Sequence, residues 1–474
     1  MSTDSEPWRL SATELSRRYR EGTLSPVGVL DACLARLDAV NPRLNAVVAQ
    51  RERAVLRGEA QASAARIERG APLSTLDGIP ISIKDNLLTA DLPTTWGSVA
   101  LARHRSAHDE LPVARARAGG ALVIGKTNVP EFTLEGYTAN RLFGVTRNPW
   151  NPALTPGGSS GGAVASVAAG ITPLALGTDG GGSIRRPASH CGVVGLKPSI
   201  GALARAHSLP SLLLDFEVVG PMARTVADVK LLFDALRGPS PLDRRSLAAE
   251  AGRGQREARA LRVLYVGTLD AAPVDAEIAA SCRRAARRLA DLGHAVNEGA
   301  MPLDLDFMGW AWPLVGQVGL AQLFEQHPEW RDAAAPKYRE MAEQGARVPA
   351  WRLWQVIEAV EQLRRDCARL FEAIDVIVTP AAAALPWPAE EAFPPFIDGQ
   401  AVGPRGHAVF TGWVNAAGLP ALAVPAEPAA SGLPIGVQMI GPYAADDLLL
   451  ELGEAYEAQA GWAHRWPDLP GEPT

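Results

Sequence analysis

The sequence predicts an α/β fold, with one large domain in which a mixed central β-sheet is covered by helices on both faces. Between residues 76 and 198, short β-branched runs alternate with glycine-rich turns and with helical stretches of small residues. This alternation is typical of a buried mixed sheet. Strand-like and helix-like segments alternate again from residue 261 to residue 379. Of the 474 residues, 47% are hydrophobic, so the chain can bury the large core that such a sheet requires.

The N-terminal part, residues 1–70, is expected to form a helical region that packs on the body of the domain, residues 71–474. A capping box predicts the start of one helix at Ser11, and a proline in the first helical position predicts the start of another at Pro26. The second helix is expected to end near residue 42, where Asn-Pro occurs. A third is expected at about residues 51–69.

Lys84 ends a predicted strand whose two faces differ. Along residues 79–84, isoleucines alternate with Pro80, Ser82 and Lys84. Because successive side chains of a strand point to opposite faces, the isoleucines share one face and Ser82 shares the other with Lys84. The lysine is therefore expected to point away from an apolar layer.

The second half of the chain continues the α/β pattern after an internal boundary. Residues 238–259 are rich in Arg, Ala and Gly and are predicted to be an exposed connection. The elements expected after it are a strand at residues 261–266, a helix at 276–292, a strand near 295–297, a long helix at 350–373 and a strand at 375–379.

Composition and charge exclude several classes of function. The 46 Lys and Arg residues are balanced by 52 Asp and Glu, and the formal net charge of −6 includes no basic block. We therefore expect no nucleic-acid partner. The four cysteines are scattered and form no CxxC pair. Neither a zinc site nor a disulfide framework is predicted.

No membrane contact is expected from the sequence. The first eight residues are polar and acidic and lack the apolar stretch of a secretory signal. The longest apolar run, residues 163–177, is too short to span a bilayer and contains Gly170 and Pro173. These features predict a cytoplasmic protein, which we expect to be a monomer or a homodimer.

Two glycine-dense turns, each containing a serine, are the most informative feature of the sequence. They occupy residues 156–162 and 177–187. Glycines allow positive φ and a close approach of the backbone to a ligand, so that successive N–H groups can converge on one point, as an oxyanion requires. Such turns can also simply join strands to helices, but two of them beside a strand-end lysine favour a site. Neither turn contains a P-loop or a GxGxxG pattern, which argues against nucleotide binding.

The ordered motifs of the chain resemble those of the amidase signature family. The resemblance covers most of the sequence and rests on five segments. These are Lys84-Asp85-Asn86, residues 125–128, residues 157–201, Gly418-Leu419-Pro420 and residues 432–438. It implies the fold described above and an enzyme that cleaves amide bonds with no metal and no organic cofactor.

The resemblance also implies a catalytic triad. The serine of the second turn, Ser183, corresponds to the nucleophile of the family, and Ser159 in the first turn corresponds to its partner serine. Lys84 corresponds to the lysine of the triad. Members of the family have a cis peptide bond before the middle serine, which here is the bond between Gly158 and Ser159.

A proton relay explains why these residue types belong together. A serine hydroxyl is a weak nucleophile and needs an adjacent base. Lysine can act as that base only when it is neutral, so Lys84 is expected to be desolvated and to have a lowered pKa. It would take the proton of Ser159 while Ser159 takes that of Ser183. A Cys-His alternative, Cys191 with His190, is disfavoured because neighbours in sequence rarely activate each other.

Residues around the triad are expected to stabilise the oxyanion and the turns. The backbone N–H groups of Gly180, Gly181, Gly182 and Ser183 are the predicted oxyanion hole. Ser160, Thr178, Asp179 and Arg185 are predicted to support it. For Arg185 a surface position is the alternative. No group of His and carboxylate residues has the spacing of a metal site.

Aromatic residues are the candidates for the substrate pocket. The variable region of about residues 302–354 contains Phe307 and five of the twelve tryptophans. The predicted pocket residues are Trp310 and Trp312 from this region, Trp413 from further along the chain, and Phe132 and Tyr137 from the loop before the serine turns. Each of these could instead be a core residue, but together they favour an apolar acyl or aryl pocket.

Three hypotheses for the function remain. The first is a stand-alone hydrolase of small aryl or alkyl amides, extending to esters and carbamates. The second is the glutaminase subunit of a glutamyl-tRNA amidotransferase. In that member of the family, an aspartate binds the α-ammonium group of the substrate glutamine. Residues 408–414, which include the corresponding position Ala408, carry no carboxylate, which argues against it. The third, a decayed binding or scaffold protein, is disfavoured because all three triad residues are present.

Overall fold

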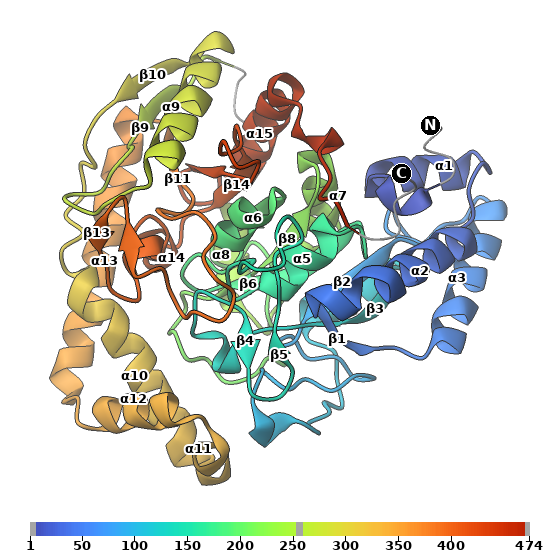
Figure 1. The fold of residues 1–474 in the computed structure, drawn as a ribbon, viewed down its shortest axis with the longest axis horizontal. Coiled ribbons are helices and arrows are strands. Elements are labelled where there is room, and N and C mark those ends of the chain that lie inside the picture. Colours follow the sequence, from blue (N-terminus) through green and yellow to red (C-terminus); the bar gives the residue numbers. More distant parts are fainter. Residues whose placement is uncertain (1–5, 253–258, 470–474) are drawn as a thin grey trace.

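A mixed β-sheet runs through the middle of the molecule (Figure 1). The computed structural model describes residues 6–252 and 259–469, in which eleven strands follow the order β1-β3-β2-β6-β8-β7-β14-β15-β11-β9-β10. β2 pairs in parallel with β3 and β6, and β9 pairs in parallel with β10 and β11, whereas the other neighbours are antiparallel. The predicted mixed sheet is confirmed.

The strands of this sheet are short, and four more strands form two small ribbons. The sheet strands are β1 Val47–Gln50, β2 Pro80–Lys84, β3 Leu122–Thr127, β6 Leu174–Asp179, β7 Val194–Lys197, β8 Val218–Ala223, β9 Arg262–Tyr265, β10 Ala295–Glu298, β11 Val376–Pro380, β14 Ala421–Pro425 and β15 Gly436–Ile440. The ribbons pair β4 Ala139–Asn140 with β5 Gly144–Val145, and β12 Phe396–Ile397 with β13 Gln400–Ala401.

Helices surround the sheet and extend beyond it. They are α1 Ala12–Arg20, α2 Pro26–Leu44, α3 Arg53–Glu68, α4 Leu111–Ala118, α5 Gly161–Ala168, α6 Arg185–Cys191, α7 Val226–Leu236, α8 Arg244–Ala251, α9 Ala276–Asp291, α10 Met308–Gln326, α11 Pro328–Ala333, α12 Pro336–Ala346, α13 Ala350–Ala373, α14 Gly412–Ala416 and α15 Asp446–Ala460. Within the described residues, none of them combines the length and the apolar character needed to cross a membrane.

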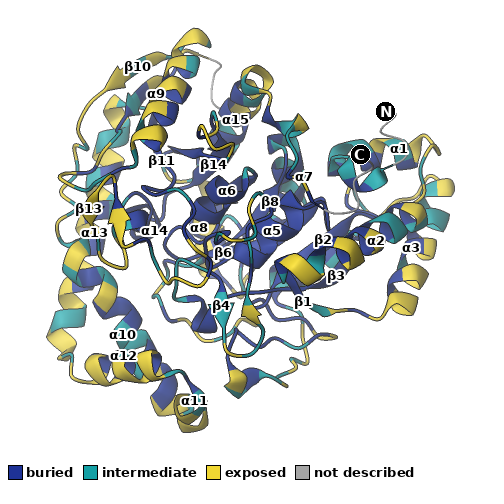
Figure 2. Ribbon diagram, viewed as in Figure 1, coloured by how far each residue is buried: buried dark blue, intermediate teal, exposed yellow. Residues whose placement is uncertain are grey.

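Helices cover both faces of the sheet, as predicted, and the strand β14 shows how. Its Leu422 lies against Gly453 of α15, where a Cβ would come within 2.4 Å of the leucine. The next residue, Ala423, belongs to an apolar cluster with Ala188 of α6. Because adjacent residues of a strand point to opposite faces, α6 and α15 cover opposite sides. The buried residues accordingly concentrate along the sheet (Figure 2).

Several elements match their predictions closely. The cap at Ser11 is present, since its Oγ accepts from the N–H of Glu14 at 3.2 Å. α13 has the predicted bounds, and α9 differs from its prediction by one residue at its end. The strands β9, β10 and β11 follow where strands were expected. Long amphipathic helices and β-branched runs therefore form where their patterns indicate.

Three predictions about elements were wrong. α2 continues through Pro42 to Leu44, because a proline in the last turn removes only one hydrogen bond. Part of the region expected to be helical, Val47–Gln50, is a strand that pairs with β3. The expected exposed connection contains α8, whose Ser246 and Ala249 are buried. The rest of that connection includes residues 253–258, which lie outside the described residues.

The two ends of the described chain meet. Trp8 and Trp466 pack edge to face with ring centroids 5.2 Å apart, and the guanidinium carbon of Arg224 lies 3.5 Å from the Trp466 ring centroid. Cation–π contacts and edge-to-face packing thus tie both ends to the body of the fold.

Candidate active site

Lys84 occupies the end of β2 and is fully buried. Its Nζ lies 2.8 Å from Ser159 Oγ, 2.9 Å from Thr178 Oγ1 and 3.0 Å from the Thr178 carbonyl oxygen. Asn86 donates to the same Thr178 hydroxyl at 3.0 Å. The alternation of side chains along β2 therefore directs the amine toward the first serine turn.

The electrostatic environment of Lys84 favours the neutral amine. Burial lowers its pKa to about 7, and the charges of Glu217 and Asp179 offset only part of this effect. Among the described residues, no carboxylate forms an ion pair with it. The chain buries two other lysines in the same region, but Lys126 lies 3.7 Å from Asp85 and Lys197 donates to the Pro198 carbonyl. Of these three lysines, only Lys84 contacts a serine of the glycine-rich turns.

The first serine turn is held against the second by its backbone. The peptide bond between Gly158 and Ser159 is cis, as the resemblance implied. The N–H of Ser160 donates to the carbonyl of Ser183 at 3.1 Å, and Ser160 Oγ donates to the Thr178 carbonyl at 3.0 Å. A Cβ on Gly158 would lie 2.4 Å from the carbonyl oxygen of Tyr137. This position therefore requires glycine.

Ser183 stands at the entrance to α6, where the second turn meets the helix. Its exposed fraction is 7%, and it lines a cavity. The preceding Gly182 has a φ of +107°, which side chains rarely tolerate. A Cβ there would also lie 2.3 Å from Thr411 Oγ1. The glycine thus lets the turn pass closely under the segment that carries Thr411.

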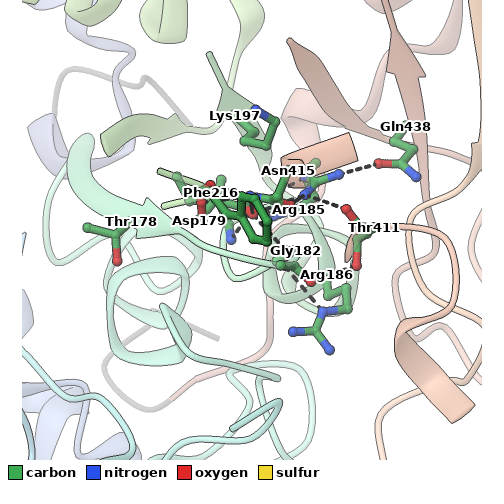
Figure 3. Close-up of polar contacts among 12 residues, drawn as sticks. Thr178, Asp179, Gly182, Arg185, Arg186, Lys197, Phe216, Thr411, Asn415 and Gln438 are labelled. Carbon is green, nitrogen blue, oxygen red and sulfur yellow. Dashed lines mark hydrogen bonds and ion pairs between the residues drawn. The ribbon is translucent and has the colours of Figure 1, made fainter. Parts of the chain in front are cut away.

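Asp179, at the end of β6, anchors the second turn. It accepts from the N–H of Gly182 at 2.6 Å and from the N–H of Ile184 at 3.0 Å. Arg185 donates to both of its carboxylate oxygens, at 3.0 and 3.1 Å (Figure 3). Burial raises the pKa of Asp179, but the charge and hydrogen bonds of Arg185 outweigh that and hold the pKa well below its usual value. The carboxylate is therefore charged.

Arg185 is fully buried, so the alternative of a surface position was wrong. Besides Asp179 it donates to Gln438 Oε1 at 3.0 Å, to the Thr411 carbonyl at 3.1 Å and to Asn415 Oδ1 (Figure 3). These three residues come from β15 and the segment around α14. Sequence reasoning missed their contribution, although Gln438 lies in one motif of the family resemblance and Asn415 adjoins another. Because a buried arginine needs several hydrogen-bond acceptors, polar residues in the neighbouring motifs could have been predicted as its partners.

The predicted oxyanion donors divide into two groups. The N–H of Gly182 is already donated to Asp179, so its assignment to an oxyanion hole needs correction. The N–H groups of Gly180, Gly181 and Ser183 have no acceptor among the residues that the structure describes. All three residues line the cavity. Their N–H groups are therefore available to a ligand.

The cavity at Ser183 has a volume of about 390 Å³, which suits a small molecule. Trp312 is the one predicted pocket residue that lines it, and a Cβ on Gly181 would lie 2.4 Å from the Trp312 ring. Other lining residues are Thr133, Leu134, Glu135, Gly136, Arg186, Leu213, Glu217, Pro313, Gly316, Lys337, Met341, Ala392, Phe393, Pro404, Arg405 and His407. The sequence did not predict that charged residues line this cavity.

Four predicted pocket residues lie elsewhere. Phe132 is fully buried in an aromatic cluster, with ring centroids 5.4 to 5.6 Å from Trp96, Phe324 and Tyr338. Trp413 is a buried core residue beside a neighbouring cavity. Trp310 packs against Arg352, whose guanidinium carbon lies 3.9 Å from the ring centroid.

The last of the four is Tyr137. Its backbone supports Gly158, and its hydroxyl accepts from Lys337 Nζ at 3.2 Å, but it does not line the cavity. None of these four residues lines the cavity at Ser183, because aromatic residues fill cores as readily as pockets.

His190 and Cys191 do not form a reactive pair. His190 Nε2 lies 3.1 Å from the Ala384 carbonyl, and burial lowers the pKa of the imidazole to about 4. The Cys191 thiol contacts the Pro156 carbonyl at 3.8 Å, and burial raises its pKa well above the usual value. A thiol with a raised pKa is inert. No set of three His, Cys, Asp or Glu residues within the described ranges could hold a metal ion.

Comparison with known proteins identifies the family. A sequence model of the Amidase family matches residues 28–450, which is most of the chain. The chain belongs to the amidase signature family. It is accordingly a serine amidase, an enzyme that acts on C–N bonds of amides.

This amidase is similar to relatives with different named activities. It is 34% identical to an acylamidase of Rhodococcus erythropolis, over 97% of both chains. It is 33% identical to one subunit of the glutamyl-tRNA(Gln) amidotransferase of Roseiflexus sp. (strain RS-1), over 98% of this chain and 99% of that one. A bacterial aryl acylamidase structure of the same family matches with a TM-score of 0.86 and 28% identity, over 98% of this chain and 99% of that one.

Proposed function

We propose that this amidase hydrolyses small aryl or alkyl amides through an acyl-enzyme on Ser183, with Ser159 and Lys84 as the proton relay. The observation that carries the proposal is the 2.8 Å contact between the buried Lys84 Nζ and Ser159 Oγ. An amine whose pKa is about 7 can accept a proton near neutral pH. Two of its contacts, to the Thr178 carbonyl and hydroxyl, use its two N–H bonds, which leaves the lone pair for the proton of Ser159.

The proposed relay accounts for every proton and bond of the reaction without a cofactor. Ser183 Oγ bonds to the amide carbonyl carbon while its proton passes to Ser159, whose own proton passes to Lys84. When the C–N bond breaks, Ser159 gives a proton to the leaving amine and regains one from Lys84. Water then attacks the acyl carbon and gives a proton to Ser159, whose own proton passes to Lys84. The bond between the acyl carbon and Ser183 Oγ breaks, and Lys84 and Ser159 return the proton to Ser183. The products are a carboxylic acid, an amine and the original enzyme.

The tetrahedral oxyanion is proposed to bind the N–H groups of Gly180, Gly181 and Ser183. These donors have no acceptor among the described residues, so they need not break a hydrogen bond to stabilise developing charge. Gly182 instead takes a positioning role, because its N–H is bonded to Asp179. Ser160, Thr178, Asp179 and Arg185 are proposed to hold the two turns in register.

The preference for aryl and alkyl groups is inferred from the cavity wall. Trp312 stacks on Phe216, with ring centroids 5.9 Å apart and an interplanar angle of 17°, and its ring lies against Gly181. An apolar group on the substrate could pack on this surface next to the carbonyl. The acylamidase names of two relatives support the same class. Esters and carbamates would pass through a similar oxyanion.

A substrate panel tests the proposal. Purified wild-type protein and the Ser183→Ala variant are assayed with anilides, aliphatic amides, esters and carbamates. We expect amide hydrolysis by the wild type and its loss in the variant. Failure of the wild type to cleave every amide, or an undiminished rate in Ser183→Ala, would refute the proposal.

A glutaminase that works within an amidotransferase is the second candidate, favoured by the 33% identity to the amidotransferase relative. The segment 408–414 has no carboxylate to bind the glutamine ammonium, and Ala408 is buried. Gel filtration coupled to activity assays separates the candidates. Amide hydrolysis that elutes with the lone chain, as a monomer or homodimer, supports the first candidate. Activity on glutamine that appears only with a partner protein supports the second.

A further inference from the structure

Arg186 is a buried cation whose partners are all neutral. Its exposed fraction is 4%, and it lines the cavity together with Ser183. It donates to the carbonyl oxygens of Gly182 at 3.3 Å and Gly158 at 3.5 Å, and it lies 2.8 Å from His407 Nε2. Among the described residues, no carboxylate forms an ion pair with it. Burying a charge without a counter-charge is costly.

His407 does not supply the missing negative charge. Burial first, and then the positive charges of Arg186 and Arg405, lower the pKa of His407 well below its usual value. The imidazole is therefore neutral, and its Nε2 accepts from Arg186. The hydrogen bond orients the guanidinium but leaves its charge uncompensated.

Arg405 is a second cation at the mouth of the cavity. It is exposed, lines the cavity, and places its guanidinium carbon 4.8 Å from the Trp312 ring centroid. No hydrogen bond or ion pair links its side chain to another described residue. Burial, followed by the charge of Arg405, lowers the pKa of Arg186 to about 9. Arginine side chains stay protonated in proteins, so both guanidinium groups are charged at neutral pH and repel each other.

The carboxylates of the cavity wall already have cationic partners. Glu135 Oε1 lies 2.5 Å from Lys337 Nζ, and Glu217 accepts from Arg205 at 2.8 Å. Each of these pairs joins residues that lie outside the turn carrying Ser183. The positive charge contributed by Arg186 and Arg405 is thus left for a ligand to neutralise.

We propose that Arg186 and Arg405 form a carboxylate subsite, so that the preferred amides of this enzyme carry a carboxylate near the scissile bond. This inference rests on the proposed function, because it names the substrate class of the same cavity. A guanidinium binds a carboxylate through paired, charge-assisted hydrogen bonds. The ligand would supply the counter-charge that Arg186 lacks, beside the nucleophile three residues earlier in the chain.

The test compares charged and neutral substrates of the same shape. One series places the carboxylate on the acyl side, as 4-nitroanilides of succinic, glutaric and adipic half-acids with their methyl esters. The other places it on the amine side, as N-acetyl-4-aminobenzoate with its methyl ester. For the wild type we expect kcat/KM to favour the charged member by about 10- to 100-fold in at least one series. A ratio near one in both series would overturn the inference.

Variants of the subsite connect that preference to the two arginines. Arg405→Gln should reduce the charged-to-neutral ratio by about tenfold, mainly through KM for the charged member. The matched control is Arg347→Gln, because Arg347 is an exposed arginine at the end of α12 that does not line the cavity. The charged-to-neutral ratio of Arg347→Gln should equal that of the wild type. Equal ratios in Arg405→Gln and the wild type would contradict the role of Arg405.

A binding measurement separates this inference from the proposed function. In Ser183→Ala, calorimetry compares the succinic half-acid 4-nitroanilide with its methyl ester. We expect the acid to bind about tenfold more tightly or better, and the advantage to fall in Ser183→Ala/Arg405→Gln. If the wild type hydrolyses no substrate but this preference is present, the proposed function fails and the subsite stands. Equal affinities would overturn the subsite even if neutral anilides are hydrolysed.

Discussion

The amine of Lys84 should control the pH dependence of the reaction. The relay requires the neutral form, and burial lowers the pKa of this lysine to about 7. Hence kcat/KM should rise as the pH increases through about 7 and level off above it. Rates measured between pH 5.5 and 9.5 on one anilide check this. The residual activity of Lys84→Ala should be much lower and should lack the inflection, so an unchanged profile in that variant would contradict the relay.

The same lowered pKa predicts a pH dependence of stability. Unfolding returns Lys84 to its ordinary pKa of about 10.4, whereas in the folded protein the pKa is about 7. Between these values the unfolded chain binds a proton that the folded chain does not, so this lysine makes stability rise with pH. Relative to Lys84→Met, the wild-type Tm should be lowest below pH 7 and should rise steadily up to about pH 10.4, where the penalty ends. A Tm difference independent of pH would contradict the burial of this amine.

At the scale of elements, the Arg185–Asp179 pair joins β6, α6, α14 and β15. Arg185→Met should lower the free energy of unfolding by about 3 to 5 kcal/mol, because it leaves the buried Asp179 charge without its partner. Denaturant titration measures this. The control is Arg339→Met, since Arg339 is exposed on α12, and it should change stability by less than about 0.5 kcal/mol. A loss below about 1 kcal/mol in Arg185→Met would refute the structural role.

Selectivity for aryl groups should depend on one tryptophan of α10. Trp312 lines the cavity, whereas Trp310 packs on Arg352. Trp312→Ala should therefore lower kcat/KM for an anilide relative to acetamide by roughly 10- to 200-fold, and Trp310→Ala should leave that ratio unchanged. Steady-state kinetics on both substrates check the expectation. Equal effects on both substrates in Trp312→Ala would instead mark a loss of packing alone.

Helix geometry explains why the sequence did not distinguish these two tryptophans. Residues two positions apart differ by about 200° around a helix axis, so they point to opposite sides, but the sequence does not say which side faces the cavity. Likewise β1 comprises four residues, too few for a clear period. α9 and α13 are long and amphipathic, and their patterns predicted them well.

At the scale of the whole molecule, the sheet order brings the predicted motifs together. β2 pairs with β6, so Lys84 lies beside Thr178 although 94 residues separate them. The ordered motifs predicted Lys84, Ser159 and Ser183 as catalytic residues, because the resemblance to a family extends along most of the chain. No motif of the sequence indicated the roles of Arg186 and Arg405. They depend on charges contributed by distant segments, which only the folded chain brings to one cavity.

The covalent labelling of the intact chain tests the central claim most directly. An aryl phosphonate or a sulfonyl fluoride reacts with an activated serine, so the intact mass of the treated wild type should increase by one adduct. The mass of treated Ser183→Ala should remain that of the unmodified chain. Peptide mapping of the wild-type adduct should place the label on Ser183. A single adduct that persists in Ser183→Ala, for example on Ser159, would contradict the assignment of the nucleophile.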